Sequence, residues 1–237
     1  VDDFLCAGNV NELHWLRIEL EKEFELTCAI LGEHNVWEGK YLNRVIRVVP
    51  DGFELEADSK HVSTLLHEWG MGQCKALDTP LGKEDWEIYE VGERMGPREA
   101  SNFRRAVARI NYLSQDRADL SVPSRKLSQH MSNPWKASQL PLKRVLRYLK
   151  GQPRLIQRIS GRGNGSRLTV LIDADWAGDA KTRKSTSGGC ILFGGNMIMH
   201  WSKLQANIAL STGEAELNAA SKGISEIVGV IETLIEF

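Results

Sequence analysis

The chain has 237 residues, of which 42% are hydrophobic and 26% are charged, and its formal net charge is -1. This composition suffices for one or two ordinary hydrophobic cores and argues against a disordered chain. The near-zero net charge neither favours nor excludes nucleic acid as a partner, because local excesses of opposite sign cancel in the sum.

The distribution of charge is more informative than its total. Acidic residues outnumber basic ones from Glu12 to Glu99. From Leu120 to Ile172 the sequence contains no Asp or Glu and eleven Lys or Arg residues. This second stretch therefore has a strong local excess of positive charge.

The four cysteines are widely spaced and form no C-x-x-C pair, so neither a zinc site nor a disulfide framework is expected. No window approaches the roughly 18 consecutive apolar residues that span a bilayer, and the N-terminus does not resemble a signal peptide. We expect a soluble protein of a reducing intracellular compartment, without a membrane partner. No Met precedes Val1 and an apolar helical pattern is still running at Phe237, so a fragment is expected.

The first part of the chain predicts a helix, a hairpin and a second, shorter helix. Asn11 is the expected cap of an amphipathic helix with its apolar residues on one face. Strands at 41–49 and 52–55 flank the turn-prone Pro50-Asp51-Gly52. A short helix with Val62, Leu65 and Leu66 should end near Gly70.

Residues 78–96 combine glycines, Pro80 and many acids, which indicates a surface linker. Two helices are predicted after it, at Arg98–Leu113 and Leu140–Leu149. The second has an apolar face and an opposite basic face. The residues of that basic face are Lys143, Arg144, Arg147 and Lys150.

The glycine-rich stretch 161–166 is the expected domain boundary, which gives domains at 1–160 and 161–237. Strands are predicted at Leu168–Ile172, followed by Asp173, and at Gly189–Phe193 and Met197–Trp201. Ser211-Thr-Gly-Glu has capping-box spacing and opens an amphipathic helix. The expected fold class is α+β.

Two acidic residues of the second domain could act together. Asp173 follows a strand and Glu216 lies in the first turns of the next helix, so both carboxylates could meet at one edge of the sheet. Such oxygen ligands suit Mg²⁺, which assists phosphodiester hydrolysis. The alternative is that these are two ordinary solvated acids among 31.

Several motifs, in one order and spacing, favour the metal interpretation. They are Asp173-Ala-Asp-Trp-Ala-Gly-Asp179, Arg183-Lys-Ser-Thr-Ser-Gly188, Trp201-Ser-Lys, and Ala209-Leu-Ser-Thr-Gly-Glu-Ala-Glu-Leu217. This series resembles the ribonuclease H domain of copia-type retrotransposon Pol polyproteins. The resemblance implies a truncated ribonuclease H-like mixed sheet with a helix, in which Asp173 and Glu216 are catalytic Mg²⁺ ligands. Asp175 and Asp179 belong to the same family pattern, and we expect them to have structural roles or to support the metal ligands. The resemblance also implies two further aspartates that the 237 residues do not contain.

The remainder resembles the reverse transcriptase of the same polyprotein. Val1-Asp2-Asp3 is similar to the end of the Tyr-x-Asp-Asp hairpin, which implies that Asp2 and Asp3 are catalytic metal ligands, although an ordinary acidic terminus is the alternative. Later motifs resemble the palm end, thumb and connection helices and hairpins. These motifs are Trp69-Gly-Met71, Thr79-Pro80, Phe103-Arg-Arg-Ala-Val, Arg117-Ala-Asp-Leu120 and Lys143-Arg-Val-Leu-Arg-Tyr-Leu-Lys-Gly151.

The basic residues indicate where nucleic acid would bind. Lys143, Arg144, Arg147 and Lys150 would grip the phosphates of an RNA–DNA hybrid or a primer-template duplex. Arg183 and Lys184 would contact phosphates from a turn. A solvated helix face and a plain turn are the respective alternatives.

The expected function is that of a fragment of a reverse transcriptase and ribonuclease H, which copies RNA into DNA and hydrolyses RNA in hybrids. With part of both catalytic sites lacking, the 237 residues are expected to be inactive alone. The alternatives are a non-catalytic nucleic-acid-binding remnant and an unstable pseudogene product. The resemblance implies a cytoplasmic virus-like particle or the nucleus as location, and it leaves the oligomeric state open.

Overall fold

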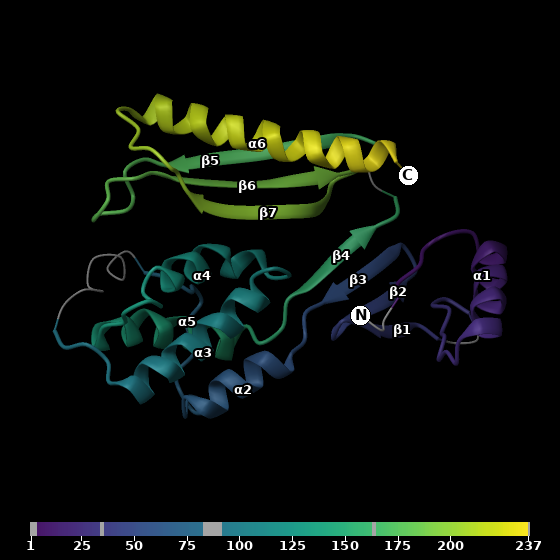
Figure 1. Ribbon diagram of the computed structural model, residues 1–237, viewed down its shortest axis with the longest axis horizontal. Coiled ribbons are helices and arrows are strands. Elements are labelled where there is room, and N and C mark those ends of the chain that lie inside the picture. Colours follow the sequence, from purple (N-terminus) through teal and green to yellow (C-terminus); the bar gives the residue numbers. More distant parts are fainter. Residues whose placement is uncertain (1–3, 34–35, 83–91, 163–164, 237) are drawn as a thin grey trace. The chain divides into compact units, whose positions relative to one another are not determined.

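The computed structural model describes residues 4–33, 36–82, 92–162 and 165–236. The chain forms two compact units, of which unit 1 comprises Val1–Asp58 and Ile156–Arg162 and unit 2 comprises Ser59–Leu155 and Gly163–Phe237. Six α-helices and two antiparallel sheets within the described ranges confirm the α+β class (Figure 1). The boundary predicted at residue 160 concerns the domains of the family, and it stays a prediction.

Unit 1 consists of helix α1 (Val10–Glu23) and a four-stranded antiparallel sheet in the order β1-β2-β3-β4. The side chain of Asn9 caps α1 and accepts a hydrogen bond from the amide of Asn11 at 3.0 Å. The helix therefore begins before Asn11, which was the predicted cap. No residue of α1 is buried.

The predicted strand at 41–49 is two strands, β1 (Glu38–Tyr41) and β2 (Arg44–Val49). They are joined by Leu42 and Asn43, whose φ angles are +47° and +64°. Two consecutive residues with positive φ form the tight hairpin turn that matches strand twist, and Asn tolerates this conformation better than most residues. Across the strands, Arg47 forms ion pairs with Glu38 of β1 and Glu56 of β3 (Gly52–Glu56).

Strand β4 (Ile156–Ser160) was not predicted, and it completes the sheet of unit 1 from far along the chain. It pairs antiparallel with β3, with Gly52 opposite Ser160 and Glu56 opposite Ile156. A Cβ on Gly52 would lie 2.0 Å from the carbonyl oxygen of Ile159. Only glycine permits this approach of the two backbones.

Unit 2 contains helices α2 (Lys60–Glu68), α3 (Pro97–Leu113), α4 (Ser121–Ser128) and α5 (Gln139–Gly151). The predictions of α2, α3 and α5 are confirmed, whereas α4 was not predicted. The apolar faces of these helices form one core. Its fully buried residues include Leu65, Phe103, Val107, Ile110, Leu113, Leu120, Leu127, Leu142, Val145, Leu146 and Leu149.

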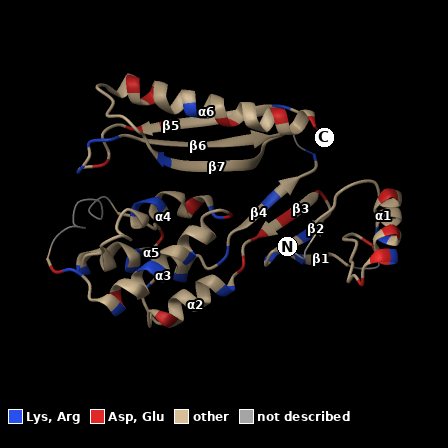
Figure 2. Ribbon diagram, in the orientation of Figure 1, with Lys and Arg blue, Asp and Glu red and all other residues tan. Residues whose placement is uncertain are grey.

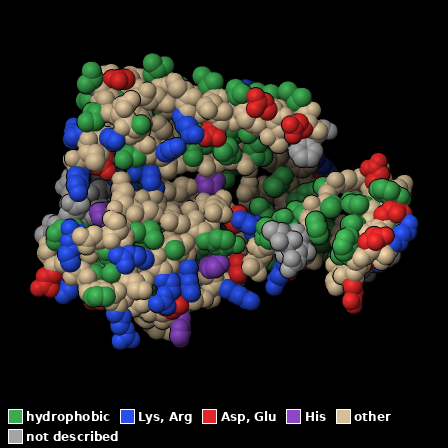
Figure 3. Space-filling model, in the orientation of Figure 1, with side chains coloured by type: hydrophobic (Ala, Val, Ile, Leu, Met, Phe, Trp, Pro, Cys, Tyr) green, Lys and Arg blue, Asp and Glu red, His purple; other side chains and the backbone are tan. Residues whose placement is uncertain are grey.

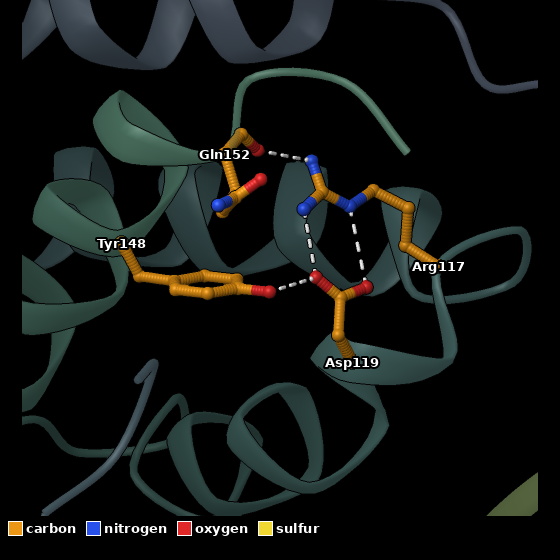
Figure 4. A network of polar contacts seen from close by, with 4 residues as sticks. All are labelled: Arg117, Asp119, Tyr148 and Gln152. Atoms are coloured by element: carbon orange, nitrogen blue, oxygen red, sulfur yellow. Dashed lines mark hydrogen bonds and ion pairs between the residues drawn. The ribbon is translucent and has the colours of Figure 1, made fainter. Parts of the chain in front are cut away.

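A polar network lies beside this core and joins the turn before α4 to the end of α5 (Figure 4). Arg117, only 1% exposed, donates to both carboxylate oxygens of Asp119, at 2.7 and 3.3 Å, and to the carbonyl of Gln152 at 2.9 Å. The hydroxyl of Tyr148 donates to Asp119 at 2.7 Å. Burial and the hydrogen bond to Asp119 raise the pKa of Tyr148. The network stays neutral overall because one cation faces one anion.

The C-terminal part of unit 2 is a three-stranded sheet covered by a helix. Strands β5 (Leu168–Asp175), β6 (Thr186–Phe193) and β7 (Asn196–Leu204) are antiparallel throughout, whereas a mixed sheet was expected. Helix α6 (Thr212–Ile235) packs on β5 and β6 through Ala215, Ala219 and Gly223. A Cβ on Gly223 would lie 2.7 Å from Ile172, so a small residue is needed for this packing.

Helix α4 contacts the sheet through polar side chains spaced four residues apart. Ser121 forms a hydrogen bond with His200 of β7 at 2.8 Å, and Arg125 donates to Ser202 of the same strand at 3.2 Å. Gln129 donates to Asp179, in the turn between β5 and β6, at 3.0 Å. These contacts join α4 to the sheet within unit 2.

Charges at this contact are partly buried. Burial lowers the pKa of Lys126, which is 5% exposed, as does repulsion by Arg125, while Asp179 and Asp175 act to raise it. Burial alone would raise the pKa of Asp179, but hydrogen bonds from Thr182 and Gln129 and the attraction of Lys126 lower it overall. The folded state therefore favours the ionised form of Asp179.

The outer side of α6 exposes apolar residues (Figure 3). They follow the helix at spacings of three, four and seven residues. They are Leu217, Ile224, Val228, Ile231 and Ile235. Within the described ranges, no helix combines the length and the apolar character needed to cross a membrane.

We expect Arg117→Met to lower the free energy of unfolding by about 3 kcal/mol, because it leaves the partly buried Asp119 carboxylate without its cation. Tyr148→Phe removes one hydrogen bond and should cost about 1–2 kcal/mol. Urea denaturation followed by circular dichroism measures both. Arg105→Met, on the exposed side of α3, is the control and should change stability by less than about 0.5 kcal/mol. An Arg117→Met protein as stable as this control would contradict the assignment.

Asp179→Asn should destabilise the protein at pH 7 by about 1 kcal/mol, because the charged acceptor facing Gln129 and Lys126 is lost. Since folding lowers the pKa of Asp179, its contribution is complete above the ordinary Asp pKa of about 3.9 and is lost as the pH falls towards the folded value. Thermal unfolding between pH 7 and pH 3 should show the difference between variant and wild type shrinking. A difference independent of pH would contradict this account.

Candidate carboxylate site and basic surfaces

Asp173 lies near the end of β5 and is exposed to solvent. Its register partner on β6 is Gly188, which in turn pairs with Ser202 of β7. The neighbouring residue Ile172 packs under α6, and side chains of a strand alternate between faces. Asp173 therefore belongs to the row of the sheet that carries Ser202, opposite the face that packs against α6.

Glu216 lies in the second turn of α6 and is also exposed. The helix starts where the capping motif predicted, because Ser211 accepts a hydrogen bond from the amide of Glu214 at 3.2 Å. The second arm of the motif is shifted by one residue, since the carboxylate of Glu214 accepts from the amide of Leu210 at 2.7 Å. This cap fixes the helical turn from which Glu216 projects.

Both acids offer the oxygen ligands that a hard cation prefers, but the structure does not show them converging, because Asp173 lies on the face of the sheet opposite α6, which carries Glu216. Among the described residues, neither Asp173 nor Glu216 has a hydrogen-bond or ion-pair partner, so all four oxygens are unshared. Two carboxylates that leave room for waters are typical of Mg²⁺ sites. Within the same ranges, no group of three or more His, Cys, Asp or Glu side chains could hold a metal ion. The assignment as metal ligands stays a prediction.

Gln205, directly after β7, is a buried amide that contacts both β6 and the start of α6. It is 8% exposed, and its amide nitrogen donates to the hydroxyl of Ser187 and to the carbonyl of Ala215, both at 2.9 Å. Its amide oxygen accepts from Asn218 at 3.3 Å. One side chain thus bridges β6 and the start of α6.

The turn between β5 and β6 is organised by its other two aspartates. A Cβ on Gly178 would lie 1.7 Å from the carboxylate of Asp175, so any other residue there would force the Asp175 side chain to move. Asp179 accepts hydrogen bonds from the amide and the hydroxyl of Thr182, each at 2.8 Å. These contacts agree with the structural role that the sequence suggested for Asp179.

Arg183 and Lys184, the predicted phosphate contacts, lie in this same turn. Arg183 is exposed, with a φ of +58°, and its amide donates to the carbonyl of Asp179 at 2.7 Å. Lys184 is partly buried, and its carbonyl accepts from the amide of Asp179 at 3.1 Å. The backbone of the turn is therefore fixed while the Arg183 side chain is accessible.

Lys and Arg residues recur along the helices of unit 2 (Figure 2). Three of those on α5 hold a neighbouring loop. Arg147 donates to the carbonyl of Lys75 at 2.8 Å, and Arg144 donates to the hydroxyl of Thr79 at 3.0 Å. Lys150 donates to the carbonyl of Gly72. Lys143, by contrast, is exposed and has no hydrogen-bond or ion-pair partner within the described ranges. Three of the four cations thus have structural contacts, and nucleic-acid binding by this face stays a prediction.

Asp2 and Asp3, the predicted polymerase ligands, lie outside the described residues. The roles of Gln205 and Arg125 were missed from the sequence, which also could not indicate that Ser121 is the partner of His200. A faint signal existed for α4, because Ser121, Arg125 and Gln129 recur at the spacing of one helix face. Neither Ser187 nor Ala215 could be identified as partners of Gln205 without the fold.

Curated relatives cover the whole length of the chain. An uncharacterised mitochondrial protein of Arabidopsis thaliana is 32% identical over 230 residues, which are 96% of this chain and 90% of that protein. The retrovirus-related Pol polyprotein from transposon RE2 of the same plant is 30% identical over 240 residues, covering all of this chain and 16% of the polyprotein. The Pol polyprotein from transposon TNT 1-94 of Nicotiana tabacum is 30% identical over 238 residues, covering 96% of this chain and 17% of the polyprotein.

The chain thus spans about one sixth of the length of the Pol polyproteins that it matches. No family model matches it. No solved structure matches it either. The similarity runs along the entire chain, both in a relative of similar length and in the much longer Pol polyproteins. The chain therefore belongs to the family of copia-type retrotransposon Pol sequences.

Proposed function

We propose that this chain is a segment of a retrotransposon reverse transcriptase and ribonuclease H, with reverse transcriptase sequence in residues 1–160 and ribonuclease H sequence in 161–237. The complete enzyme would copy RNA into DNA and hydrolyse RNA in RNA–DNA hybrids. The observation that carries this proposal is the similarity to Pol polyproteins over the whole chain. Its location would be a cytoplasmic virus-like particle or the nucleus.

In the nuclease part, Asp173 and Glu216 would each contribute a carboxylate to a Mg²⁺ site. Both carboxylates are exposed and unshared within the described ranges, which is what an incoming cation requires. Mg²⁺ at this place would activate water and stabilise charge on the scissile phosphate. Asp2 and Asp3 would serve the polymerase in the same manner.

Residues 1–237 would not hydrolyse RNA on their own. They supply two of the four carboxylates that the family resemblance implies for the nuclease, and two of three for the polymerase. A metal held by too few ligands is neither bound tightly nor oriented correctly towards a phosphate.

A second candidate function is non-catalytic binding of nucleic acid. The observation that favours it is the acid-free stretch between Leu120 and Ile172. Because Arg144, Arg147 and Lys150 hold the loop at 72–79, Lys143 is the residue of the predicted basic helix face that is left without such a contact, and Arg183 is exposed in the turn after β5.

We expect the purified chain to leave a labelled RNA–DNA hybrid intact in Mg²⁺ or Mn²⁺, as judged by gel electrophoresis with a commercial ribonuclease H as positive control. The reason is the incomplete set of carboxylates. Mg²⁺-dependent cleavage that disappears in Asp173→Asn would refute inactivity while supporting the nuclease assignment. Cleavage that persists in Asp173→Asn would indicate a contaminating nuclease.

Lys143→Gln should weaken binding to the hybrid and reduce the slope of log affinity against log salt by about one unit, as expected for one phosphate contact. Its stability should not change, since Lys143 has no partner within the described ranges. Arg147→Gln should instead lower stability by about 1 kcal/mol through loss of its hydrogen bond to Lys75. Fluorescence anisotropy between 50 and roughly 300 mM salt measures the slope. Lys22→Gln on α1 serves as the matched control, and a salt-independent affinity would exclude phosphate binding.

A further inference from the structure

Strand β5 lies at an open edge of its sheet. The sheet has the order β5-β6-β7, and among the described residues no strand pairs with the other side of β5. The carbonyl of Arg167 accepts from the amide of Gly194, just after β6, in the register of the β5–β6 pair. Because peptide groups alternate in direction along a strand, those of Leu168, Val170 and Ile172 point to the open edge. Such an unpaired edge is a template for another strand.

The β5 edge is complementary in charge to a second copy of itself. In an antiparallel pair that places Val170 opposite Val170 of the second copy, Arg167 of each copy lies opposite Asp173 of the other. Both side chains are exposed and have no hydrogen-bond or ion-pair partner within the described ranges. Two-fold symmetry therefore produces two cross-strand pairs of opposite charge at once.

Helix α6 carries an apolar seam with the heptad spacing of a coiled coil, in which every first and fourth residue is apolar. The first positions are Leu217, Ile224 and Ile231, and the fourth positions are Ala220, Ile227 and Leu234. None of the six is buried, and Leu217 and Ile224 are 66% and 60% exposed. Side chains at this spacing interlock with the same pattern on another helix, so the seam favours a helical partner.

The seam lies on the flank of α6 that is next to the open edge of β5. On the other flank, Asn218 donates to Gln205, which follows β7. Ala219 and Gly223 lie between the two flanks, and a Cβ on Gly223 would lie 2.7 Å from Ile172 of β5. Successive residues are about 100° apart around a helix, which places the seam opposite Asn218. Because α6 runs along β5 (Figure 1), the seam and the strand edge form one continuous surface.

The spacing of the strands would bring two copies of α6 to packing distance. Helix α6 packs over both β5 and β6, so it lies roughly one strand spacing, about 4.8 Å, from an axis at the β5 edge. A two-fold axis perpendicular to the sheet puts both helices on the same face and antiparallel. Their separation is then about 10 Å, close to the 8–10 Å of packed helices. One arrangement therefore satisfies the strand edge and the seam together.

We propose that unit 2 forms a two-fold dimer with a second copy of this chain, in which the β5 strands pair antiparallel and the α6 seams pack against each other. Two three-stranded sheets thereby become one six-stranded antiparallel sheet with both helices on one face. This dimer goes beyond the proposed function and does not depend on the metal site. An Asp173 carboxylate paired with Arg167 of the second copy would not be free to bind Mg²⁺.

Analytical ultracentrifugation of the full chain over a wide range of concentration measures the dissociation constant of the dimer. Arg167→Asp places like charges opposite each other at both pairs and should raise this constant about tenfold, as should Asp173→Arg. The double variant exchanges the signs of the pairs and should return the constant towards the wild-type value. Arg98→Asp makes the same change in charge at the exposed start of α3, and it should leave the constant unchanged.

Ile224→Asp tests the seam by placing a carboxylate between the two helices. Because a charge buried there has no partner, the dissociation constant should rise by more than about a hundredfold. Ile224 is exposed in the single chain, so the variant should fold, which circular dichroism checks. Ser225→Asp introduces the same charge at the next, exposed position outside the seam and should have little effect.

Hydrogen exchange, observed by nuclear magnetic resonance, locates the pairing at single residues. The amides of Val170 and Ile172 should gain protection as the protein concentration rises, because they point to the second copy. The amides of Thr169 and Leu171 point to β6 and should be protected at every concentration.

Three results would overturn the inference. A wild-type chain that stays monomeric would leave the β5 edge to a different protein. A dimer that neither Arg167→Asp nor Ile224→Asp weakens would use another surface. Open-ended aggregates in place of a dimer would contradict the two-fold symmetry, which closes the assembly at two copies.

Discussion

The buried ion pair between Arg117 and Asp119 is the interaction on which the arrangement of unit 2 depends. A guanidinium with 1% exposure is tolerated only when its donors are satisfied, and Asp119 and the Gln152 carbonyl accept from all three of its nitrogens. These bonds fix the short turn before α4 against the end of α5. The direction of α4 follows from that turn, and with it the contact of Ser121 and Arg125 with β7. One network thus connects the helical core to the sheet that carries Asp173.

The elements predicted correctly from sequence are those in which the spacing of apolar residues along the element itself indicates the secondary structure. Helices α3 and α5 have apolar residues at helical spacing, and both were found within two residues of their bounds. Strand β4 was missed because its partner, β3, lies about a hundred residues earlier, and a five-residue segment has little pattern of its own. Helix α4 was missed because its exposed-looking polar residues face the sheet, which hides the usual contrast between two faces.

In the candidate site, too, features that depend on a local motif could be predicted, whereas contacts with residues far along the chain could not. The order of motifs from Asp173 to Leu217 indicated both acids as candidates, and the capping motif at Ser211 correctly predicted the start of α6. The sequence could not indicate that Arg144, Arg147 and Lys150 hold a loop, because their partners are backbone carbonyls and a hydroxyl about 65 to 78 residues away. The sequence therefore predicted the basic face of α5 correctly. A cation that already donates a hydrogen bond within the protein, however, is less available to bind a phosphate.

The three aspartates at the end of β5 differ in what surrounds them, and this difference indicates which of them can meet a cation. Asp179 already accepts hydrogen bonds from Thr182 and Gln129, so a metal would have to displace them. Asp175 lies against Gly178 and is attracted by Arg125 and Lys126, whose positive charges would oppose a divalent ion. Asp173 is exposed and shares neither oxygen within the described ranges. The exposed, unshared carboxylate of Asp173 is thus the one that the family motif also indicates, and its role as a metal ligand stays a prediction.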